Sequence, residues 1–486
     1  MSDSPDVFEL ALKKFTPAEI GTTVSPTFRF ACEVHCATKN LTYQDMVYVK
    51  DLAVFRDYED NFADVIEVSL MFPMGTFMYD VYDNLENIEI TLKELTQFYE
   101  EPKARTETKP YVKTTRYKAI YLKDKNTAIP NTRSMSRDDL NQRLPVVVMF
   151  QLIEKSAEAL RIKTVGGSFT SGKTGVTAEQ FLRTTFSQES NKILIDNQPP
   201  IDVFDIAKFD NTEVIKQLLI PSHTRLIELP DYLQEKLGGI YNDGLSCYVQ
   251  TVMKKPGEYK NTLAIFNLYN PDSPGPADSV IYCLNDSAKS SSYVGGIHDK
   301  SGKGVHLLAH RLSGIEDDKT TRALNRGTGF RVTDASKIME APVTYKAGGA
   351  VFDRNQTATE VIGKDRTDGG NFAINKGIGH NNLVLTTDVF KRGSVTVTVQ
   401  VSNVDHTLLA PGKKYEVHYL TNEVLSDGTV QKKMAKRYGY VLQVLSAYTN
   451  NNPDLLANSN GTYVELTNHT TLKMVVGKIL NTEESI

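Results

Sequence analysis

One octapeptide matches the pattern of a phosphate-binding loop. It reads Gly167-Ser-Phe-Thr-Ser-Gly-Lys-Thr174, and in such loops backbone N–H groups cradle phosphates while the Lys reaches the terminal phosphate. A working loop follows a buried strand, and its helix begins within the motif, so that the helix N-terminus faces the phosphate. Here the preceding segment, 160–165, carries Arg and Lys, and the next helix is signalled only at Thr177. We therefore favour a Gly/Ser-rich turn, and nucleotide binding stays an alternative.

Two further groups have the residue types of metal sites. His306 and His310 are four residues apart, a spacing that places two imidazoles on one ion if the segment is helical. However, Leu stands where a zinc protease has its general-base Glu. Cys32, His35 and Cys36 supply three potential ligands, but the apolar alternation puts both thiols on the buried face of a strand and His35 on the other face. We therefore favour ordinary, partly exposed histidines in the first group and ordinary packing of the thiols in the second.

The rest of the sequence contains no recognisable catalytic constellation. There is no Gly-x-Ser-x-Gly elbow and no other nucleophile–base pair, and the carboxylates are scattered. We therefore predict that the protein is not an enzyme. We also predict no catalytic, cofactor-binding or metal-binding residue, and no cofactor.

Composition places the chain among ordinary soluble proteins. Of its 486 residues 40% are hydrophobic, and 55 basic against 59 acidic residues leave a net charge of −4. This length predicts about two to four domains, and the charge balance excludes a tight duplex-DNA binder. The N-terminal residues predict no secretory signal. The longest apolar run, within 146–153, is too short to span a membrane, and four cysteines fit a reducing cytoplasm.

Hydrophobic alternation predicts a β-rich chain in which two β regions flank a mixed centre. In the first region we expect an antiparallel meander and two further strands, at 46–55, 65–72, 87–93, 117–122 and 144–153. A helical connector follows at 154–161 and 177–186, and its second helix opens with a capping box from Thr177 to Gln180. A turn at 238–244 and strands at 246–250 and 263–266 complete the centre. The last quarter has strands at 394–402, 414–420, 438–445 and 462–467.

Several of these stretches resemble, in order, the central baseplate hub proteins of contractile-tailed bacteriophages, the T-even-type hub family. The resemblance spans most of residues 45–475 and consists of strand and turn patterns rather than a catalytic signature. It is carried by 57–77, 144–153, 159–161, 176–182, 227–234, 239–241, 265–270, 408–417, 438–442 and 471–475.

The resemblance implies a fold and an organisation. The fold class is α+β and β-rich, with two tail-tube-like antiparallel β domains, a helical connector and a loop-rich inserted module. The expected boundaries are 1–160 for the first tube-like domain, 161–245 for the connector, 246–385 for the insertion and 386–486 for the C-terminal part of the second tube-like domain. The Gly-, Ser- and Asp-rich stretch 271–385 has no counterpart in this picture.

The resemblance also implies a function. Three chains, each with two tube-like domains, would present six domains to the sixfold tail tube and a threefold face to the central spike. The protein would be a structural virion component of the tail baseplate, made in the host cytoplasm. Its partners would be tail tube, spike and other baseplate proteins, with genomic DNA only passing through the lumen. The alternatives are a P-loop nucleotide-binding protein, or another tail component such as a tube, tube-initiator or sheath protein.

Overall fold

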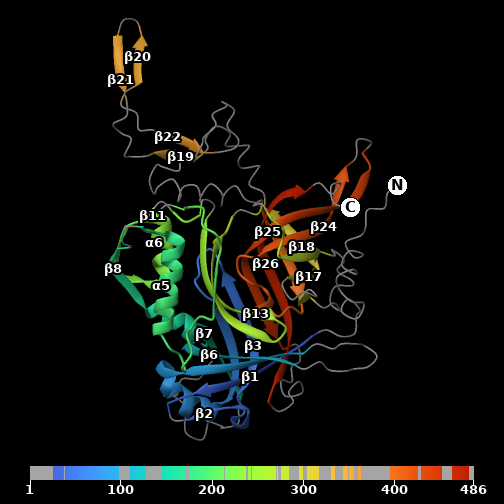
Figure 1. Ribbon diagram of the computed structural model, residues 1–486. Coiled ribbons are helices and arrows are strands. Elements are labelled where there is room, and N and C mark those ends of the chain that lie inside the picture. Colours follow the sequence, from blue (N-terminus) through green and yellow to red (C-terminus); the bar gives the residue numbers. More distant parts are fainter. Residues whose placement is uncertain are drawn as a thin grey trace.

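The computed structural model describes most of the chain (Figure 1). The described residues are 26–97 without 38, 110–126, 145–283 without 171, 173, 213, 237–238, 242–243, 270 and 272–274, 295–298, 304–316, 330–333, 343–347, 350–354, 359–362, 395–450 without 425–427, and 462–480. The predicted N-terminal segment, most of the loop at 123–143 and most of the module at 271–385 lie outside this set. The β-rich α+β fold class is confirmed.

The described part contains one large sheet and several small ones. The strands of the large sheet are β1 (Thr27–His35), β2 (Asn40–Leu41), β3 (Tyr48–Asp57), β4 (Val65–Pro73), β5 (Glu89–Gln97), β6 (Tyr111–Tyr121), β7 (Pro145–Glu154), β15 (Ser279–Cys283), β16 (Gly296–His298), β17 (Val305–Ala309), β18 (Arg311–Glu316), β23 (Val395–Ser402), β24 (Lys414–Val424), β25 (Val430–Thr449) and β26 (Val464–Leu480).

Short turns of helix interrupt this sheet. They are α3 (Met74–Thr76), η1 (Tyr43–Asp45), η2 (Phe77–Val81), η3 (Tyr82–Asn87), η4 (Lys123–Lys125) and η9 (His406–Leu408). Two ribbons pair separately, β19 (Phe330–Thr333) with β22 (Thr359–Ile362) and β20 (Val343–Ala347) with β21 (Ala350–Arg354).

The large sheet closes into a first ring because its two longest strands, β25 and β26, pair with each other. The order β25-β3-β4-β7-β6-β5-β1-β26 returns to its start through that pairing, which joins Tyr448 to Asn468 and Leu445 to Thr471. A closed ring leaves no free strand edge within it. We call these strands the first ring.

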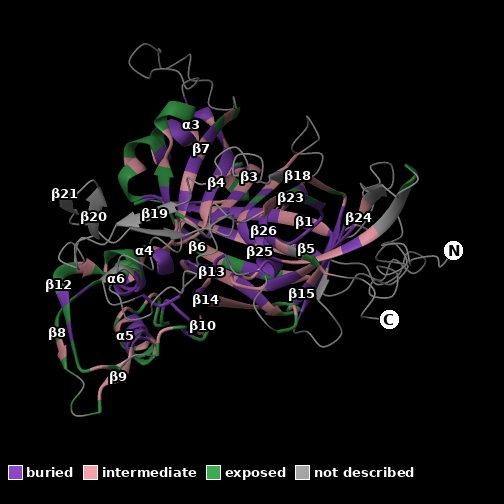
Figure 2. Cartoon of the chain, turned by 90° about the horizontal axis from the view of Figure 1, so that it is seen from above, coloured by how far each residue is buried: buried purple, intermediate pink, exposed green. Residues whose placement is uncertain are grey.

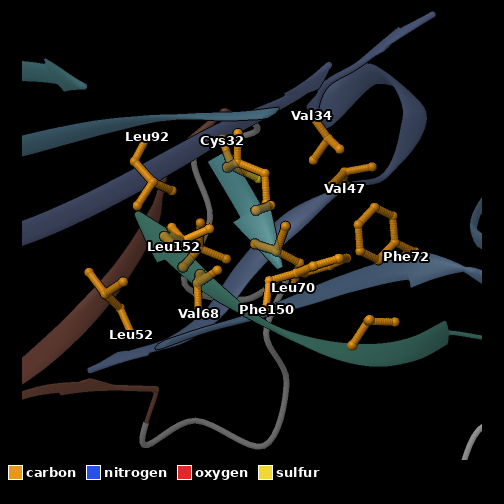
Figure 3. Close-up of a cluster of buried hydrophobic side chains, with 14 of the residues drawn as sticks. Cys32, Val34, Val47, Leu52, Val68, Leu70, Phe72, Leu92, Phe150 and Leu152 are labelled. Atoms are coloured by element: carbon orange, nitrogen blue, oxygen red, sulfur yellow. The ribbon is translucent and has the colours of Figure 1, made fainter. Parts of the chain in front are cut away.

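Inward-facing apolar residues fill the first ring. Figure 3 shows side chains from several of its strands, among them Val34, Val68 and Phe150, pointing toward one another. Alternate residues of β4 face this core, and Ile66, Val68, Leu70 and Phe72 are all buried. This is the period of two expected of a strand with one face in a core.

The same two long strands continue into a second ring. On one side β25 pairs with β24, which leads to β15, β17 and β16; on the other side β26 pairs with β23 and then β18. The two arms meet at His310, between β17 and β18, whose backbone N–H donates to the carbonyl of Gln400 in β23 at 2.9 Å. We call β24, β15, β17, β18, β23 and the adjoining halves of β25 and β26 the second ring, and it encloses its own apolar core.

A helical unit packs against the rings. Its helices are α4 (Lys155–Ile162), α5 (Ala178–Lys192) and α6 (Leu229–Lys236), with η6 (Leu226–Glu228) before α6. Its strands are β8 (Thr164–Thr170), β9 (Val176–Thr177), β10 (Val203–Ile206), β11 (Val214–Ile215), β12 (Gln217–Arg225), β13 (Leu245–Lys255) and β14 (Glu258–Asn267). Figure 1 shows α5 and α6 on one side of β13 and the long strand β25 on the other.

Strands β13 and β14 face two cores at once. Val249 and Leu263 belong to the core beneath the helices, whereas Tyr248 and Phe266 belong to the core of the second ring. Both faces of this sheet are therefore buried, which explains the nearly continuous apolar run at 263–266.

Most predicted strands are confirmed, with two corrections. The meander is correct only for its first antiparallel pair, β3 with β4; β5 does not follow in the sheet, because β4 pairs next with β7 and β5 pairs with β6 and β1. The last two strands are much longer than predicted, since β25 and β26 each serve both rings. The capping box at α5 is confirmed, with Thr177 Oγ1 accepting from the Gln180 N–H at 3.3 Å. Among the described residues, no helix is long and apolar enough to cross a membrane.

The domain boundaries predicted from the sequence stay a prediction. The core of the second ring draws on residues from Tyr58 to Val476, and that of the first ring includes Tyr448 and Leu466 near the end of the chain. Each ring is therefore built from segments far apart in the sequence.

Candidate functional site: a buried charged junction

The most unusual polar residues lie where the two rings and the helical unit meet. Arg56, near the end of β3, has no exposed surface. Its Nε and Nη2 donate to the two carboxylate oxygens of Asp64 at 2.9 and 3.0 Å, and its Nη1 donates to the carbonyls of His406 and Leu409 at 2.6 and 3.3 Å. The guanidinium therefore ties the turn between β3 and β4 to the segment that follows β23.

Arg56 stays charged despite its burial. Loss of solvent by itself lowers the pKa of the guanidinium, but the charge and hydrogen bonds of Asp64, together with Tyr58 and Tyr248, outweigh it, so that the pKa lies above its ordinary value. A charge removed from water is tolerated only when it is paired and fully hydrogen-bonded. Asp64 and the two carbonyls meet that condition.

The same turn is joined to the helical unit. The hydroxyl of Tyr58 donates to Gln250 Oε1 at 2.8 Å, and Gln250 Nε2 donates to the Leu409 carbonyl at 2.6 Å. The N–H of Val249 in β13 donates to the carbonyl of Phe62 at 2.8 Å. Leu409 thus accepts from the first ring and from the helical unit.

A second buried ion pair lies in β5 and β6. Lys113 Nζ donates to Glu94 Oε1 at 2.8 Å, and both residues are less than a tenth exposed. Burial raises the pKa of Glu94, although the positive charge of Lys113 acts to lower it. Burial lowers the pKa of Lys113, but the charge and hydrogen bond of Glu94, together with Tyr117 and Glu154, outweigh it, so that the pKa lies above its usual range.

His406 lies next to this pair as a neutral imidazole. Its pKa lies well below the usual value, because of burial first and then the positive charges of Lys113 and Arg56. The Tyr448 hydroxyl accepts from the backbone N–H of His406 at 3.3 Å and lies 2.9 Å from Nδ1. Because the hydroxyl oxygen already accepts this hydrogen bond, we assign the Tyr448 hydroxyl as the donor to Nδ1 of the imidazole. The imidazole then carries its own proton on Nε2, which lies 3.7 Å from Glu94 Oε2.

Asp405 completes the contact between the rings. Its carboxylate accepts from Thr96 Oγ1 in β5 at 2.9 Å and from the N–H and Oγ1 of Thr407 at 2.9 and 2.6 Å. We call Arg56, Asp64, Glu94, Lys113, Asp405, His406, Tyr448 and Gln250 the junction.

The junction fits a structural role better than a catalytic one. Arg56 and Gln250 are 0% exposed, His406 and Tyr448 1%, and Lys113 6%, so these groups do not face solvent from which a substrate could come. Perturbed pKa values also arise in buried structural networks. Because its hydrogen bonds are directional and span three units, the junction fixes their relative orientation.

The octapeptide lies elsewhere, in the helical unit. Its residues Gly167 to Thr170 belong to β8, which pairs antiparallel with β12, so its first half is strand rather than the predicted turn. Gly172 and Gly175 have φ values of 68° and 72°, and α5 begins only at Ala178. In the described residues of this motif, no helix N-terminus is available at the position where a phosphate loop needs it. Ser171 and Lys173 lie outside the described residues.

The fold does not bring together the residues of either predicted metal-ligand group. Cys32 and Cys36 are buried, and burial raises the pKa of their thiols to about 12 and about 11, with Asp80 adding to the second. His35 turns the other way and lies 2.8 Å from Thr91 Oγ1. His306 is in a strand rather than a helix. The described residues contain no group of three or more His, Cys, Asp or Glu side chains able to hold a metal ion.

Sequence reasoning missed the junction, although a signal was present. Arg56 continues the buried series Leu52 and Val54 along β3, and Glu94 continues Ile90 and Leu92 along β5. A charged residue at an inward position of an apolar strand needs a buried partner. The charged partners Asp64 and Lys113 lie only 8 and 19 residues away. The carbonyls of His406 and Leu409 lie about 350 residues from Arg56, so the pattern could flag the site but could not complete it.

Comparison with known proteins found only distant structural likenesses. No family model matches the chain, and no curated protein matches its sequence. Among solved structures, the 43 kDa tail protein of prophage MuSo2 from Shewanella oneidensis matches with a TM-score of 0.39 at 8% identity, over 92% of this chain and 96% of that one. A chain of the Francisella PdpA–VgrG complex matches with a TM-score of 0.39 at 10% identity, over 94% and 59% of the two chains.

A third likeness is to the c3393 protein of E. coli. That protein is described as a type VI secretion component with structural similarity to the bacteriophage T4 tail proteins gp27 and gp5. The match has a TM-score of 0.38 at 8% identity and covers 92% of this chain and 77% of that one. These likenesses are distant, so the functional proposal below rests on the chain itself.

Proposed function

We propose that this protein is a structural component of a contractile-tail baseplate and, within it, the hub that joins the tail tube to the central spike. The observation that carries the proposal is the pair of strand rings built on one hairpin, β25–β26. Three chains with two rings each would offer six ring units to a sixfold tube and a threefold face to a spike. The sequence resemblance over 57–77, 144–153 and 408–417 supports the same role.

The long hairpin suits a protein that carries mechanical load. β25 is 20 residues long, which at about 3.3 Å per residue spans roughly 65 Å. Its second half pairs with β3 in the first ring and its first half with β24 in the second ring. A continuous hydrogen-bonded strand and the buried junction hold the two rings as one body, as a symmetry adaptor requires.

Association surfaces rather than a pocket are what this role requires. At η1 and in the turns after α3, the first ring presents exposed aromatic and sulfur side chains: Tyr79 is 54% exposed, Met46 47% and Tyr82 42%. Figure 2 shows exposed residues around α3, away from the buried strands. Tyr and Met are enriched in protein interfaces, so we assign this end of the first ring to a contact with a neighbouring tail protein.

The proposed DNA conduit follows from the charge balance. A net charge of −4 over 486 residues gives little phosphate neutralisation, so DNA would pass through a lumen without being held. A strongly basic lumen in an assembled particle would contradict this part of the proposal.

Electron microscopy of assembled particles tests the proposal. The chain is co-expressed with neighbouring tail proteins, and the purified particles are classified by symmetry. We expect three copies per particle with six ring-shaped densities facing the tube. Sixfold particles built from this chain would instead identify a tube, tube-initiator or sheath protein, and absence of trimers with partners present would refute the hub role.

A further inference from the structure

Two imidazoles converge on one hydroxyl on the outer side of the second ring. His310 Nε2 lies 2.5 Å from Ser402 Oγ, and His469 Nδ1 lies 3.0 Å from the same oxygen. His310 Nε2 and His469 Nδ1 are therefore no further apart than the sum of these two distances. Three chain segments meet here, because His310 separates β17 from β18, Ser402 ends β23 and His469 lies opposite it in β26.

The cluster is open to solvent on one side. His469 is exposed and His310 is partly exposed, whereas Ser402 beneath them is buried. Ser402 and His469 are direct cross-strand partners in the register of β23 and β26. This register holds the His469 imidazole beside Ser402, and an ion could enter from the side of His469.

The chemistry of these three groups suits a metal ion. Neutral imidazole nitrogens are preferred ligands of late first-row divalent cations, at about 2.0–2.1 Å for Zn²⁺. Two such ligands at tetrahedral angles lie about 3.4 Å apart, which small rotations of the two rings can reach from the present positions. The Ser402 hydroxyl has one proton and can donate to only one of the two imidazoles, so the other must donate its own N–H to Oγ. In the tautomer in which both nitrogens facing Ser402 are unprotonated, a cation can accept both lone pairs.

We propose that His310 and His469 bind one Zn²⁺ or Ni²⁺ ion, with water and the Ser402 hydroxyl able to complete its coordination. The ion would bridge the β17–β18 corner to β26 across β23, at the point where the two arms of the sheet close the second ring. His306, which the sequence spacing paired with His310, is not part of the site, because it lies in β17 with its ring 6.4 Å from that of Tyr282. This inference does not depend on the proposed baseplate function.

Calorimetry on the full-length protein tests the site. The protein is freed of metal with EDTA, dialysed and titrated with ZnCl₂ or NiCl₂, and one site per chain is expected. His310→Ala and His469→Ala each should weaken binding by more than about tenfold, since even the loss of an outer-shell partner costs 10–100-fold. Ser402→Ala should retain the site. His223→Asn, which changes an exposed His on β12 at a φ of 69° that Asn tolerates, is the matched control.

Two readouts separate a metal site from a folding defect. Binding to the folded state stabilises it, so Zn²⁺ should raise the thermal midpoint of the wild type and of His223→Asn, EDTA should reverse the rise, and Mg²⁺ should cause none. In the wild type, Cu²⁺ electron paramagnetic resonance counts the bound nitrogens without any substitution, and two imidazole nitrogens are expected. Absence of binding to the wild type, unchanged affinity in both His variants, or a different nitrogen count overturns the proposal.

Discussion

Removal of the Asp64 carboxylate tests whether the junction holds the three units together. In Asp64→Asn, Arg56 keeps its two carbonyl acceptors but loses the charge that compensates its own. Arg56 is 0% exposed and cannot reach water without opening the junction. Breaking a buried pair in this way costs about 3–5 kcal/mol. We expect the lower end, about 3 kcal/mol, because the Asn amide oxygen can still accept one of the two lost hydrogen bonds.

The assay is urea unfolding followed by circular dichroism, with hydrogen exchange of the segment around His406 and Leu409 as a local readout. The matched control is Glu179→Gln, which removes a carboxylate at 3.3 Å from Arg183 on the exposed face of α5. Exposed pairs contribute about 0–1 kcal/mol. If Asp64→Asn costs no more than this control and leaves exchange near His406 unchanged, the reasoning about the junction is wrong.

Replacing both partners gives a second check on the same physics. In Arg56→Met with Asp64→Leu no buried charge is left without a partner, and such replacements are often close to neutral. The double variant should therefore be more stable than Asp64→Asn. A double variant that is clearly less stable would mean that the Arg56 hydrogen bonds to the two carbonyls dominate over its charge.

Three further predictions follow from other parts of the chain. The pKa of His406 is depressed in the folded state, so the unfolded state binds the extra proton first and stability falls as pH drops below about 6.5. In His406→Gln, the slope of the unfolding free energy against pH between 6.5 and 5.5 should lessen by up to about 1.4 kcal/mol per pH unit. An unchanged slope would contradict a neutral His406. Gly439 in β25 leaves no room for a side chain, since a Cβ there would lie 2.8 Å from the Val475 carbonyl oxygen. Gly439→Val should therefore lower the free energy of unfolding in urea by about 1–3 kcal/mol. Gly428→Val, with open space around it but a φ of 82°, reports the cost of backbone strain alone. Tyr79→Asp should leave the thermal midpoint within a degree or two of wild type and reduce co-purification with neighbouring tail proteins several-fold, and unimpaired co-purification would remove this end of the first ring from the interface.

Local pattern was sufficient for most of the secondary structure. The alternation Ile66, Val68, Leu70 and Phe72 predicted β4 because a strand with one buried face must repeat every two residues. The capping box at Thr177 was readable because its partner, Gln180, lies three residues away. Both signals are local, and no distant part of the chain had to be known.

Pairing between strands could not be read in the same way. β1 lies between β5 and β26, and β3 lies between β4 and β25, so the first ring is closed by strands from opposite ends of the chain. Alternation states that a strand has one buried face but does not state which strand lies beside it. The predicted meander failed beyond its first strand pair for this reason.

The candidate sites divide along the same line. The sequence by itself determined that Cys32 and Cys36 face a core and that the octapeptide lacks a helix where a phosphate would need one. Only the tertiary structure decided which residues contact each candidate side chain. Asp64 neutralises the charge of Arg56, and the His406 carbonyl accepts one of its hydrogen bonds. His469 rather than His306 shares the Ser402 hydroxyl with His310. The physical reason is that burial is a property of a strand's own pattern, whereas hydrogen bonds and ion pairs depend on which distant residues the closed rings bring within 3 Å or so.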